Sequence, residues 1–291
     1  MPGPHRHLGD RGRRRQRARR ARGPARAVET VLATLAKQPD DLRADVQIIS
    51  VGAAGALTAP DAAAEIARHL GDATRVDLAV TSDVVTAHAG ALDGEPGTVL
   101  VAGTGAVACG IDRRGRLRRT DGVGIWLGDD GSGRWIGQRG LSAALRAADG
   151  RGGTTSLVQA AIAELGPLAD LPTRIGSSPT PERVLASFAP AVLDAAEAGD
   201  AIALAIRDAA AAALAVTARA AAPDGDSPVA VLGGLTGHAG FAAALATALA
   251  ERNLRSTTPR GDALDGAVLI GSRPRLPHEK QVTRVRSAFP R

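Results

Sequence analysis

The chain has 291 residues, of which 44% are hydrophobic and only 2% aromatic, so we expect a core of Ala, Val, Leu and Ile in one large domain or two lobes. Its net charge is +6. The positive charge lies at the start, because residues 1–26 hold ten arginines and one aspartate, and the remaining residues have a net charge of −3. A lone cysteine, Cys109, excludes an internal disulfide and a cysteine-ligand cluster, and it is expected to be a small buried thiol.

Residues 1–24 form an arm rich in Arg, Gly and Pro without apolar periodicity, which predicts disorder. No aromatic residue lies between its arginines to stack on bases, so it supports at most a general polyanion-binding tail and no specific nucleic acid partner. A plain extension and a wrongly assigned start of the reading frame are the alternatives. We find no secretory signal and no apolar run of membrane-spanning length, and therefore expect a cytoplasmic protein without membrane contact.

Helix and strand patterns alternate after the arm, which is typical of an α/β fold. Val76 to Val80 predicts a buried strand whose carboxyl end delivers Asp83, directly before another helix. Open α/β sheets bind ligands at the carboxyl ends of their strands, so Asp83 is a candidate catalytic residue. The alternative is that its carboxylate caps the helix. Other elements expected in this part are a helix over 25–36, a strand over 46–51 and a helix over 61–70.

The stretch from Thr98 to Gly133 is the most informative part of the sequence. Two apolar runs, Thr98 to Ala102 and Ala106 to Ile111, flank the turn Gly103-Thr104-Gly105, and a third strand can follow over Arg116 to Arg119. A dinucleotide-binding turn would need a helix directly after the glycines, and a Walker loop would need Gly-Lys-Ser/Thr. The pattern therefore predicts a β-hairpin. Its backbone N–H groups can cradle phosphate, although a tight turn that binds nothing is the alternative.

A glycine-rich loop with Asp129 and Asp130 follows, and then a helix that begins near Ser132. The tryptophans at 126 and 135 are expected to be packing residues. Later helical stretches are predicted near 154–165, 181–198 and 200–222, and again over about 237–251 and 262–271. Between them, Val229 to Leu232 predicts a strand that enters Gly233-Gly234.

These elements suggest a division of the chain into four parts. The break at Arg151 to Thr154 is a plausible lobe boundary. We expect a disordered arm over 1–24, an incomplete N-terminal lobe with the hairpin over 25–150, a helical and adenosine-binding part over 151–272, and a basic tail over 273–291.

The residues from Ala102 to Leu145 closely resemble the BadF/BadG/BcrA/BcrD-type ATPase family, which includes the N-acetylglucosamine kinases. The matching motifs are Gly103-Thr104-Gly105, Gly122-Val123-Gly124 and Leu127 to Ser132. Ala106 replaces the usual serine and Val123 the usual tryptophan. The resemblance extends from about residue 44 to residue 271. It implies a two-lobed, actin-like ATPase fold with a ribonuclease-H-like core.

The resemblance also implies which residues bind the nucleotide. ATP with Mg²⁺ would lie between the lobes, and no residue can be assigned as a metal ligand. The implied cofactor-binding residues are Gly103, Thr104, Gly105 and Ala106 for the phosphates, and Gly233 and Gly234 for adenosine.

On the substrate side, the resemblance makes Asp83 the catalytic base that accepts the proton of a sugar hydroxyl. It places Gly122, Val123, Gly124 and Asp129, together with Asp83, in contact with the sugar. The implied partner is a small-molecule amino sugar, either N-acetylglucosamine or glucosamine, and a homodimer is compatible with the family.

Two other functions stay open. The second branch of the family, the ATPase activators of 2-hydroxyacyl-CoA dehydratases, holds an iron–sulfur cluster on cysteines, and a single cysteine inside a strand disfavours it. The family also begins with a second phosphate hairpin of the type Asp-Gly-Gly-Gly-Thr, and we find none upstream of Asp45. The chain is thus expected to be an amino-sugar kinase or a truncated, inactive homologue that at most binds nucleotide. Weak ATP binding and poor or absent sugar phosphorylation are expected of the chain as written.

Overall fold

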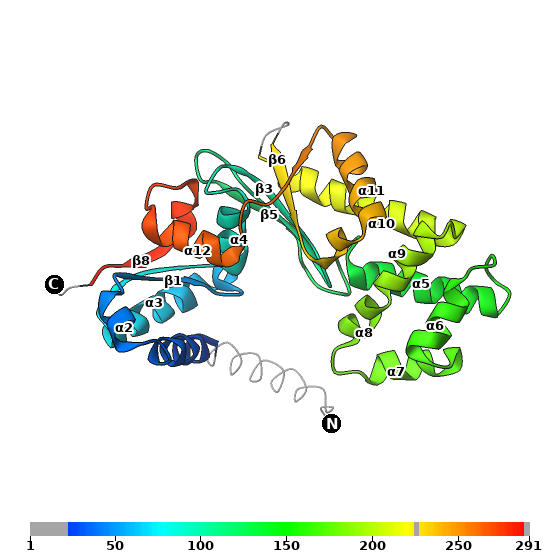
Figure 1. Ribbon diagram of the computed structural model, residues 1–291, viewed down its shortest axis with the longest axis horizontal. Helices are drawn as coiled ribbons and strands as arrows, with labels where there is room; N and C mark the ends of the chain where they lie inside the picture. The colour runs from blue at the N-terminus through cyan, green and yellow to red at the C-terminus, as the bar shows by residue number, and fades with distance from the viewer. Residues whose placement is uncertain (1–22, 224–226, 288–291) are drawn as a thin grey trace, which may run out of the picture. The chain divides into compact units, whose positions relative to one another are not determined.

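The computed structural model describes residues 23–223 and 227–287, which divide into two compact units. Unit 1 joins the described residues up to Gly94 with those from Gly261 onward, and unit 2 spans Glu95–Arg260 (Figure 1). The segment from Arg151 to Thr154, where the sequence suggests a lobe boundary, lies inside unit 2. Residues 1–22 of the predicted disordered arm and residues 288–291 of the basic tail are outside the described residues.

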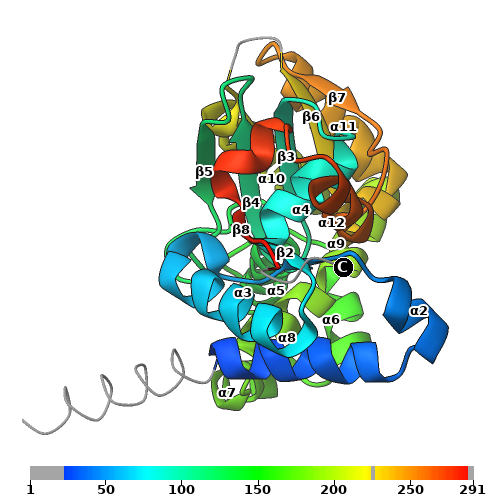
Figure 2. The ribbon, with the colours of Figure 1, turned by 90° about the vertical axis from the view of Figure 1, so that its left-hand side faces the viewer.

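Unit 1 is built on a three-stranded sheet with the order β1-β2-β8. β1 (Ile48–Gly52) and β2 (Asp77–Thr81) are parallel, and β8 (Thr283–Val285) pairs with β2 in the antiparallel direction. β2 and β8 are labelled in Figure 2. β8 lies in the segment expected to be a tail, and it forms one edge of the sheet. The helices of the unit are 23–36, α2 (Asp40–Asp45), α3 (Pro60–Thr74), α4 (Asp83–Ala91) and α12 (Ala263–Ser272), with 3-10 turns at Ala56–Thr58 and Pro277–Gln281.

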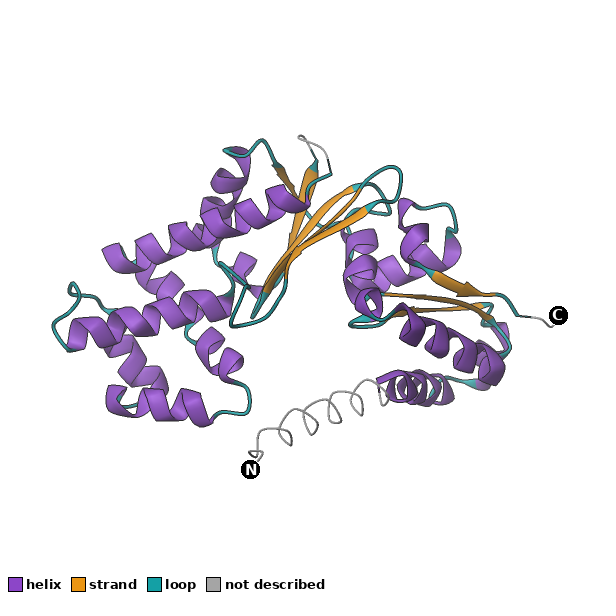
Figure 3. Cartoon of the chain, turned by 180° about the vertical axis from the view of Figure 1, so that it is seen from behind, coloured by secondary structure: helices purple, strands orange, loops and turns teal. Residues whose placement is uncertain are grey.

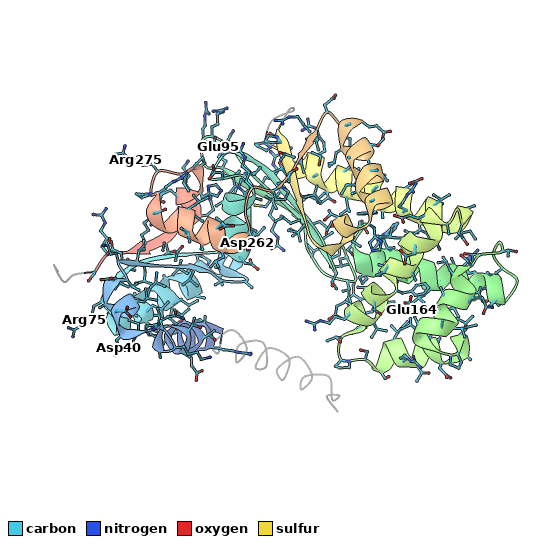
Figure 4. The ribbon with its side chains drawn as sticks, in the orientation of Figure 1. Asp40, Arg75, Glu95, Glu164, Asp262 and Arg275 are labelled. Atoms are coloured by element: carbon cyan, nitrogen blue, oxygen red, sulfur yellow. The ribbon has the colours of Figure 1, made fainter. Side chains whose placement is uncertain are left out.

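The strands of unit 1 carry apolar side chains on both faces because helices cover both. Ile49 and Val51 pack with the core side chains of α3, whereas Ile48 and Ser50 lie next to Gly271 of α12. This alternation follows the two-residue period of a strand. α4 and α12 approach each other closely, since a Cβ on Gly90 would lie 1.7 Å from the carbonyl oxygen of Asp262. Asp262, which is labelled in Figure 4, caps α12.

Unit 2 contains a five-stranded mixed sheet with the order β5-β4-β3-β6-β7. β3 (Gly97–Ala102), β4 (Ala106–Ile111) and β5 (Leu117–Asp121) form an antiparallel meander, which confirms the predicted hairpin and third strand. β6 (Pro228–Leu232) lies parallel to β3, and β7 (Arg255–Thr257) lies parallel to β6. Cys109 is fully buried in β4, as expected.

Two helices of unit 2, α10 (Ala201–Ala221) and α11 (Ala239–Ala250), pack against this sheet, and the remaining helices pack on α10 and on one another (Figure 3). The predicted helix over 181–198 is two helices, α8 (Pro181–Ser187) and α9 (Ala189–Glu197), because Pro190 has no N–H to donate back along a continuous helix. Asp200 caps α10, as its sequence position suggests. The other helices are α5 (Gly133–Ala148), α6 (Leu157–Leu165) and α7 (Leu171–Ser177), with 3-10 turns at Leu168–Asp170 and Gly234–Gly237.

α10 is the core helix of unit 2. By length and composition it is apolar enough to cross a membrane, contrary to the expectation from the sequence, and no other described helix is both as long and as apolar as a membrane span requires. Its buried side chains, among them Leu214 and Ala218, join the main hydrophobic cluster, and the helix contacts β3, β4 and β5. Packing against the sheet accounts for its apolar composition.

Candidate functional site

The two glycine motifs of unit 2 lie side by side at one edge of its sheet. β3 and β6 are parallel neighbours that pair up to Val101 and Leu232, so the segments that follow them leave the sheet at the same edge. Gly233 has φ 111° and ψ 164°, and a Cβ there would lie 2.4 Å from the carbonyl oxygen of Ala102. This close approach requires glycine at position 233. Gly234 has open space where a side chain would be.

The Gly103-Thr104-Gly105 turn is fixed by the first residues of α5. The backbone N–H groups of Gly133 and Arg134 donate to the carbonyl oxygens of Gly103 and Thr104, at 2.8 and 3.1 Å. The N–H and C=O of a trans peptide point in opposite directions, so the N–H groups of Thr104 and Gly105 point away from α5. Neither donates to another described residue. Two free, adjacent N–H groups and the exposed Thr104 hydroxyl form a concavity suited to an anion.

Asp129 connects the glycine-rich loop to this hairpin. Its side chain is only 8% exposed, and its Oδ1 accepts a hydrogen bond from the N–H of Ala106 at 3.2 Å. A Cβ on Gly105 would lie 3.2 Å from Oδ2 of Asp129, which makes Gly105 the residue against which the carboxylate packs. The structure thus brings Asp129 together with the predicted phosphate-binding turn.

Asp121, which sequence reasoning missed, shapes the loop over residues 122–130. Its carboxylate accepts hydrogen bonds from the N–H groups of Asp129 at 2.8 Å and Asp130 at 3.2 Å. A Cβ on Gly128 would lie 2.2 Å from Oδ1 of Asp121, so the loop passes very close to this side chain. The signal that could have revealed it is an acidic residue at the end of a strand, directly before the Gly-Val-Gly motif.

The tip of the 122–130 loop is apolar and exposed. Gly122 and Gly124 adopt positive φ values of 68° and 93°, and Val123 between them is 64% exposed. Trp126, which was expected to pack, is 84% exposed, so that prediction is wrong, whereas Trp135 on α5 is buried as expected. The loop curves through its glycines around the Asp121 carboxylate, and this path leaves the apolar side chains of its tip outside the core.

Asp83 belongs to unit 1 and is the first residue of α4. Ser82 is the N-cap, and its Oγ accepts from the N–H of Val84 at 3.4 Å. The Asp83 carboxylate accepts from the same N–H at 2.8 Å and from the Ser82 hydroxyl at 2.8 Å, and the side chain is exposed. Asp83 therefore contributes to capping, the alternative considered from sequence, while its second carboxylate oxygen stays available to a ligand.

The residues present fit a nucleoside triphosphate better than a protein-bound metal ion. The free N–H groups at Thr104 and Gly105 suit phosphate oxygens, and the open space at Gly234 suits a flat base. Within residues 23–223 and 227–287, no group of three or more His, Cys, Asp or Glu side chains is arranged to hold a metal. A Mg²⁺ ion at such a site would be held largely by phosphate oxygens and water.

Comparison with known proteins gives a consistent set of relatives. Residues 10–271 match the sequence model of the BadF/BadG/BcrA/BcrD ATPase family. An N-acetylmuramic acid/N-acetylglucosamine kinase from Clostridium acetobutylicum is 31% identical over 131 residues, which are 44% of this chain and 42% of that protein. The chain therefore spans less than half the length of this curated relative.

Two solved structures share most of the fold. A candidate N-acetylglucosamine kinase from Chromobacterium violaceum superposes with a TM-score of 0.67 at 28% identity, over 86% of this chain and 87% of that one. A second candidate N-acetylglucosamine kinase, from Porphyromonas gingivalis, has a TM-score of 0.60 at 19% identity and covers 78% of each chain, which is a likeness of fold.

Proposed function

Because the chain belongs to the BadF/BadG/BcrA/BcrD ATPase family, we propose that it is an ATP-dependent amino-sugar kinase. Its fold is the mixed α/β, actin-like fold of ATPases and sugar kinases. The proposed acceptor is N-acetylglucosamine, which the names of its relatives contain, or glucosamine, which the family resemblance implies. The observation that carries the proposal is the turn at Gly103-Thr104-Gly105 with two free N–H groups, which lies beside the Gly233-Gly234 turn at one sheet edge.

The nucleotide is proposed to bind along this edge. Its phosphates would accept hydrogen bonds from the N–H groups of Thr104 and Gly105 and from the Thr104 hydroxyl. Adenosine would lie against Gly234, where no side chain occupies the space. Bound Mg²⁺ would neutralise charge on the phosphoryl group that is transferred.

The proposed chemistry is transfer of the γ-phosphoryl group to a sugar hydroxyl. The Asp83 carboxylate accepts the hydroxyl proton as the sugar oxygen bonds to the γ-phosphorus, the bond from that phosphorus to the bridging oxygen breaks, and ADP leaves. Asp129 and the Gly122-Val123-Gly124 segment are proposed to contact the amino sugar. Support for these roles comes from the exposed carboxylate at the start of α4 and from the family motifs.

A second candidate function is nucleotide binding without turnover. The Gly103-Thr104-Gly105 and Gly233-Gly234 turns, which both belong to unit 2, would suffice for it. The iron–sulfur branch of the family gains no support from Cys109. Burial raises the pKa of this thiol to about 12, against the opposing charge of Arg119, so the thiolate that a cluster needs is strongly disfavoured.

A coupled ADP-release assay separates these functions. With N-acetylglucosamine or glucosamine, a kinase releases ADP and forms sugar phosphate in equal amounts, and it releases little ADP with no sugar. Calorimetric titration with ATP should be run on the same preparation. Nucleotide binding with no ADP release from any amino sugar would favour the second function, and ADP release that does not depend on sugar would contradict both.

A further inference from the structure

Arg134 is a buried arginine that contacts both loops of the candidate site in unit 2. It is the second residue of α5, and only 5% of its surface is exposed. Its backbone N–H donates to the carbonyl oxygen of Thr104 at 3.1 Å, and its Nη2 donates to the carbonyl oxygen of Gly128. One residue therefore holds the hairpin with its main chain and the 122–130 loop with its side chain.

The guanidinium group of Arg134 contacts neutral acceptors. Its Nη1 donates to Oε1 of Gln138 at 2.9 Å, and its Nε is buried without a hydrogen-bond partner. No carboxylate of the described residues forms an ion pair with it. Burial of a cation without a counter-ion is costly, and an apolar side chain of similar volume would satisfy the core at less cost. Stability alone does not account for an arginine here.

Gly128 is held so that movement at Arg134 reaches the rest of the loop. A Cβ on Gly128 would lie 2.2 Å from Oδ1 of Asp121, which in turn accepts from the N–H of Asp129. A ligand on the other side of the same peptide groups that displaced the Thr104 carbonyl would also move the start of α5. The hydrogen bond from Arg134 to Gly128 would carry this movement to the loop.

We propose that Arg134 is a positioning residue that transmits phosphate occupancy of the Gly103-Thr104-Gly105 hairpin to the 122–130 loop. The inference rests on the proposed function in taking nucleotide phosphates as the ligand of the hairpin. It goes further in assigning a physical link between the nucleotide side and the sugar side of the site. Nucleotide binding then raises the affinity for the amino sugar, and the reverse holds by the same factor.

Trp126 provides a reporter of the loop that does not depend on activity. The chain has two tryptophans, the exposed Trp126 in the loop and the buried Trp135 on α5. Protein labelled with 5-fluorotryptophan therefore gives two ¹⁹F resonances, which Trp126→Phe assigns. Addition of a non-hydrolysable ATP analogue to the full chain should shift the Trp126 resonance.

The test compares Arg134→Met, which removes all donors, with Arg134→Lys, which keeps the cation but cannot span Gly128 and Gln138. Arg146→Met is the matched control, because Arg146 is an exposed arginine at the other end of α5. The nucleotide-induced shift is expected in wild type and in the control, and is lost in Arg134→Met while the nucleotide Kd changes less than about threefold. By calorimetry, the analogue should lower the wild-type Kd for N-acetylglucosamine by about fivefold or more, and this ratio should fall to about one in Arg134→Met.

Contrary outcomes are equally specific. A Trp126 shift that persists in Arg134→Met would assign the link to Asp129, the other contact between loop and hairpin, and would overturn the proposal. If Arg134→Met does not fold, Arg134→Lys carries the test, and a wild-type shift in that variant overturns it. Wild-type protein that binds nucleotide and shows the shift but binds no amino sugar would contradict the kinase proposal while supporting the role of Arg134. No nucleotide binding at all would overturn both.

Discussion

The carboxylate of Asp129 accepts a hydrogen bond from the backbone N–H of Ala106, across 3.2 Å, in a nearly buried environment. Ala106 opens the second strand of the hairpin, and Asp129 lies in the glycine-rich loop with a left-handed φ of 59°. Asp121 holds this backbone conformation by accepting from the Asp129 N–H. An aspartate proposed to bind sugar is therefore also a structural partner of the turn proposed to bind phosphate.

Substitution of Asp129 should separate these two roles. Asp129→Ala leaves the Ala106 N–H without its acceptor, and we expect the free energy of unfolding to fall by about 1–3 kcal/mol. Asp129→Asn keeps an acceptor oxygen, so its free energy of unfolding should fall by less. Its affinity for the amino sugar should still fall, because the negative charge is gone. Urea denaturation and calorimetry measure the two effects. A fully stable Asp129→Ala protein would show that the hydrogen bond to Ala106 contributes nothing to the fold.

The two adjacent glycines after β6 should respond differently to alanine. Gly233→Ala forces a Cβ against the Ala102 carbonyl oxygen at a φ of 111°, and we expect a loss of about 2–4 kcal/mol of stability. Gly234→Ala enters open space and should change stability by less than about 1 kcal/mol. Its methyl group should instead weaken ATP binding, because adenosine is proposed to lie there. Equal stability of the two variants, compared by thermal melting, would contradict this account of the turn.

A buried histidine pair in unit 1 predicts a pH dependence of stability. Nε2 of His278 lies 2.8 Å from Nδ1 of His88, and both side chains are fully buried. Burial, and then electrostatic repulsion from His88, lower the pKa of His278 to about 3 from its usual 6.5. The unfolded chain therefore binds this proton more readily than the folded chain. The contribution of neutral, buried His278 to the free energy of unfolding is complete above pH 6.5 and is lost as the pH falls from 6.5 toward 3.

His278→Gln should consequently flatten the decline in stability between pH 6.5 and 4, by up to about 1.4 kcal/mol per pH unit. The exposed His69 on α3 offers a matched control, and His69→Gln should keep the wild-type slope. Urea denaturation at a series of pH values gives the slopes. A decline that is as steep in His278→Gln as in wild type would assign the acid sensitivity to other groups.

The hairpin and the helix after it could be predicted because their signals are local. Apolar runs on both sides of Gly103-Thr104-Gly105 fit only a hairpin, and Ser132 supplies the cap of α5 through its hydroxyl, which accepts from the N–H of Trp135. The family motifs extended this to the loop and to the Gly233-Gly234 turn. The residues that determine these turns and the helix cap lie within a few positions of one another in the sequence.

The structural features that could not be predicted from the sequence depend on contacts between distant segments. β8 pairs with β2 across about two hundred residues, and its three residues carry too little periodicity to be recognised alone. Trp126 is exposed because its loop curves through its glycines around the Asp121 carboxylate. The hydrophobic pattern of the sequence does not reveal this path. The buried state of Arg134 likewise follows from its reach to Gly128, a contact between separate segments that the residue spacing of α5 does not reveal.

We propose above all that Asp83 is the catalytic base in phosphoryl transfer to an amino sugar, and Asp83→Asn tests this most directly. Asp61→Asn is the matched control, since Asp61 is also an exposed aspartate in the first turn of a unit 1 helix. In the coupled ADP-release assay with N-acetylglucosamine and with glucosamine, we predict that Asp83→Asn lowers kcat by about 10²–10⁴-fold. Its Kd for ATP should stay within about threefold of wild type, and Asp61→Asn should retain full activity. Amino-sugar-dependent turnover by Asp83→Asn at the wild-type rate would contradict the account.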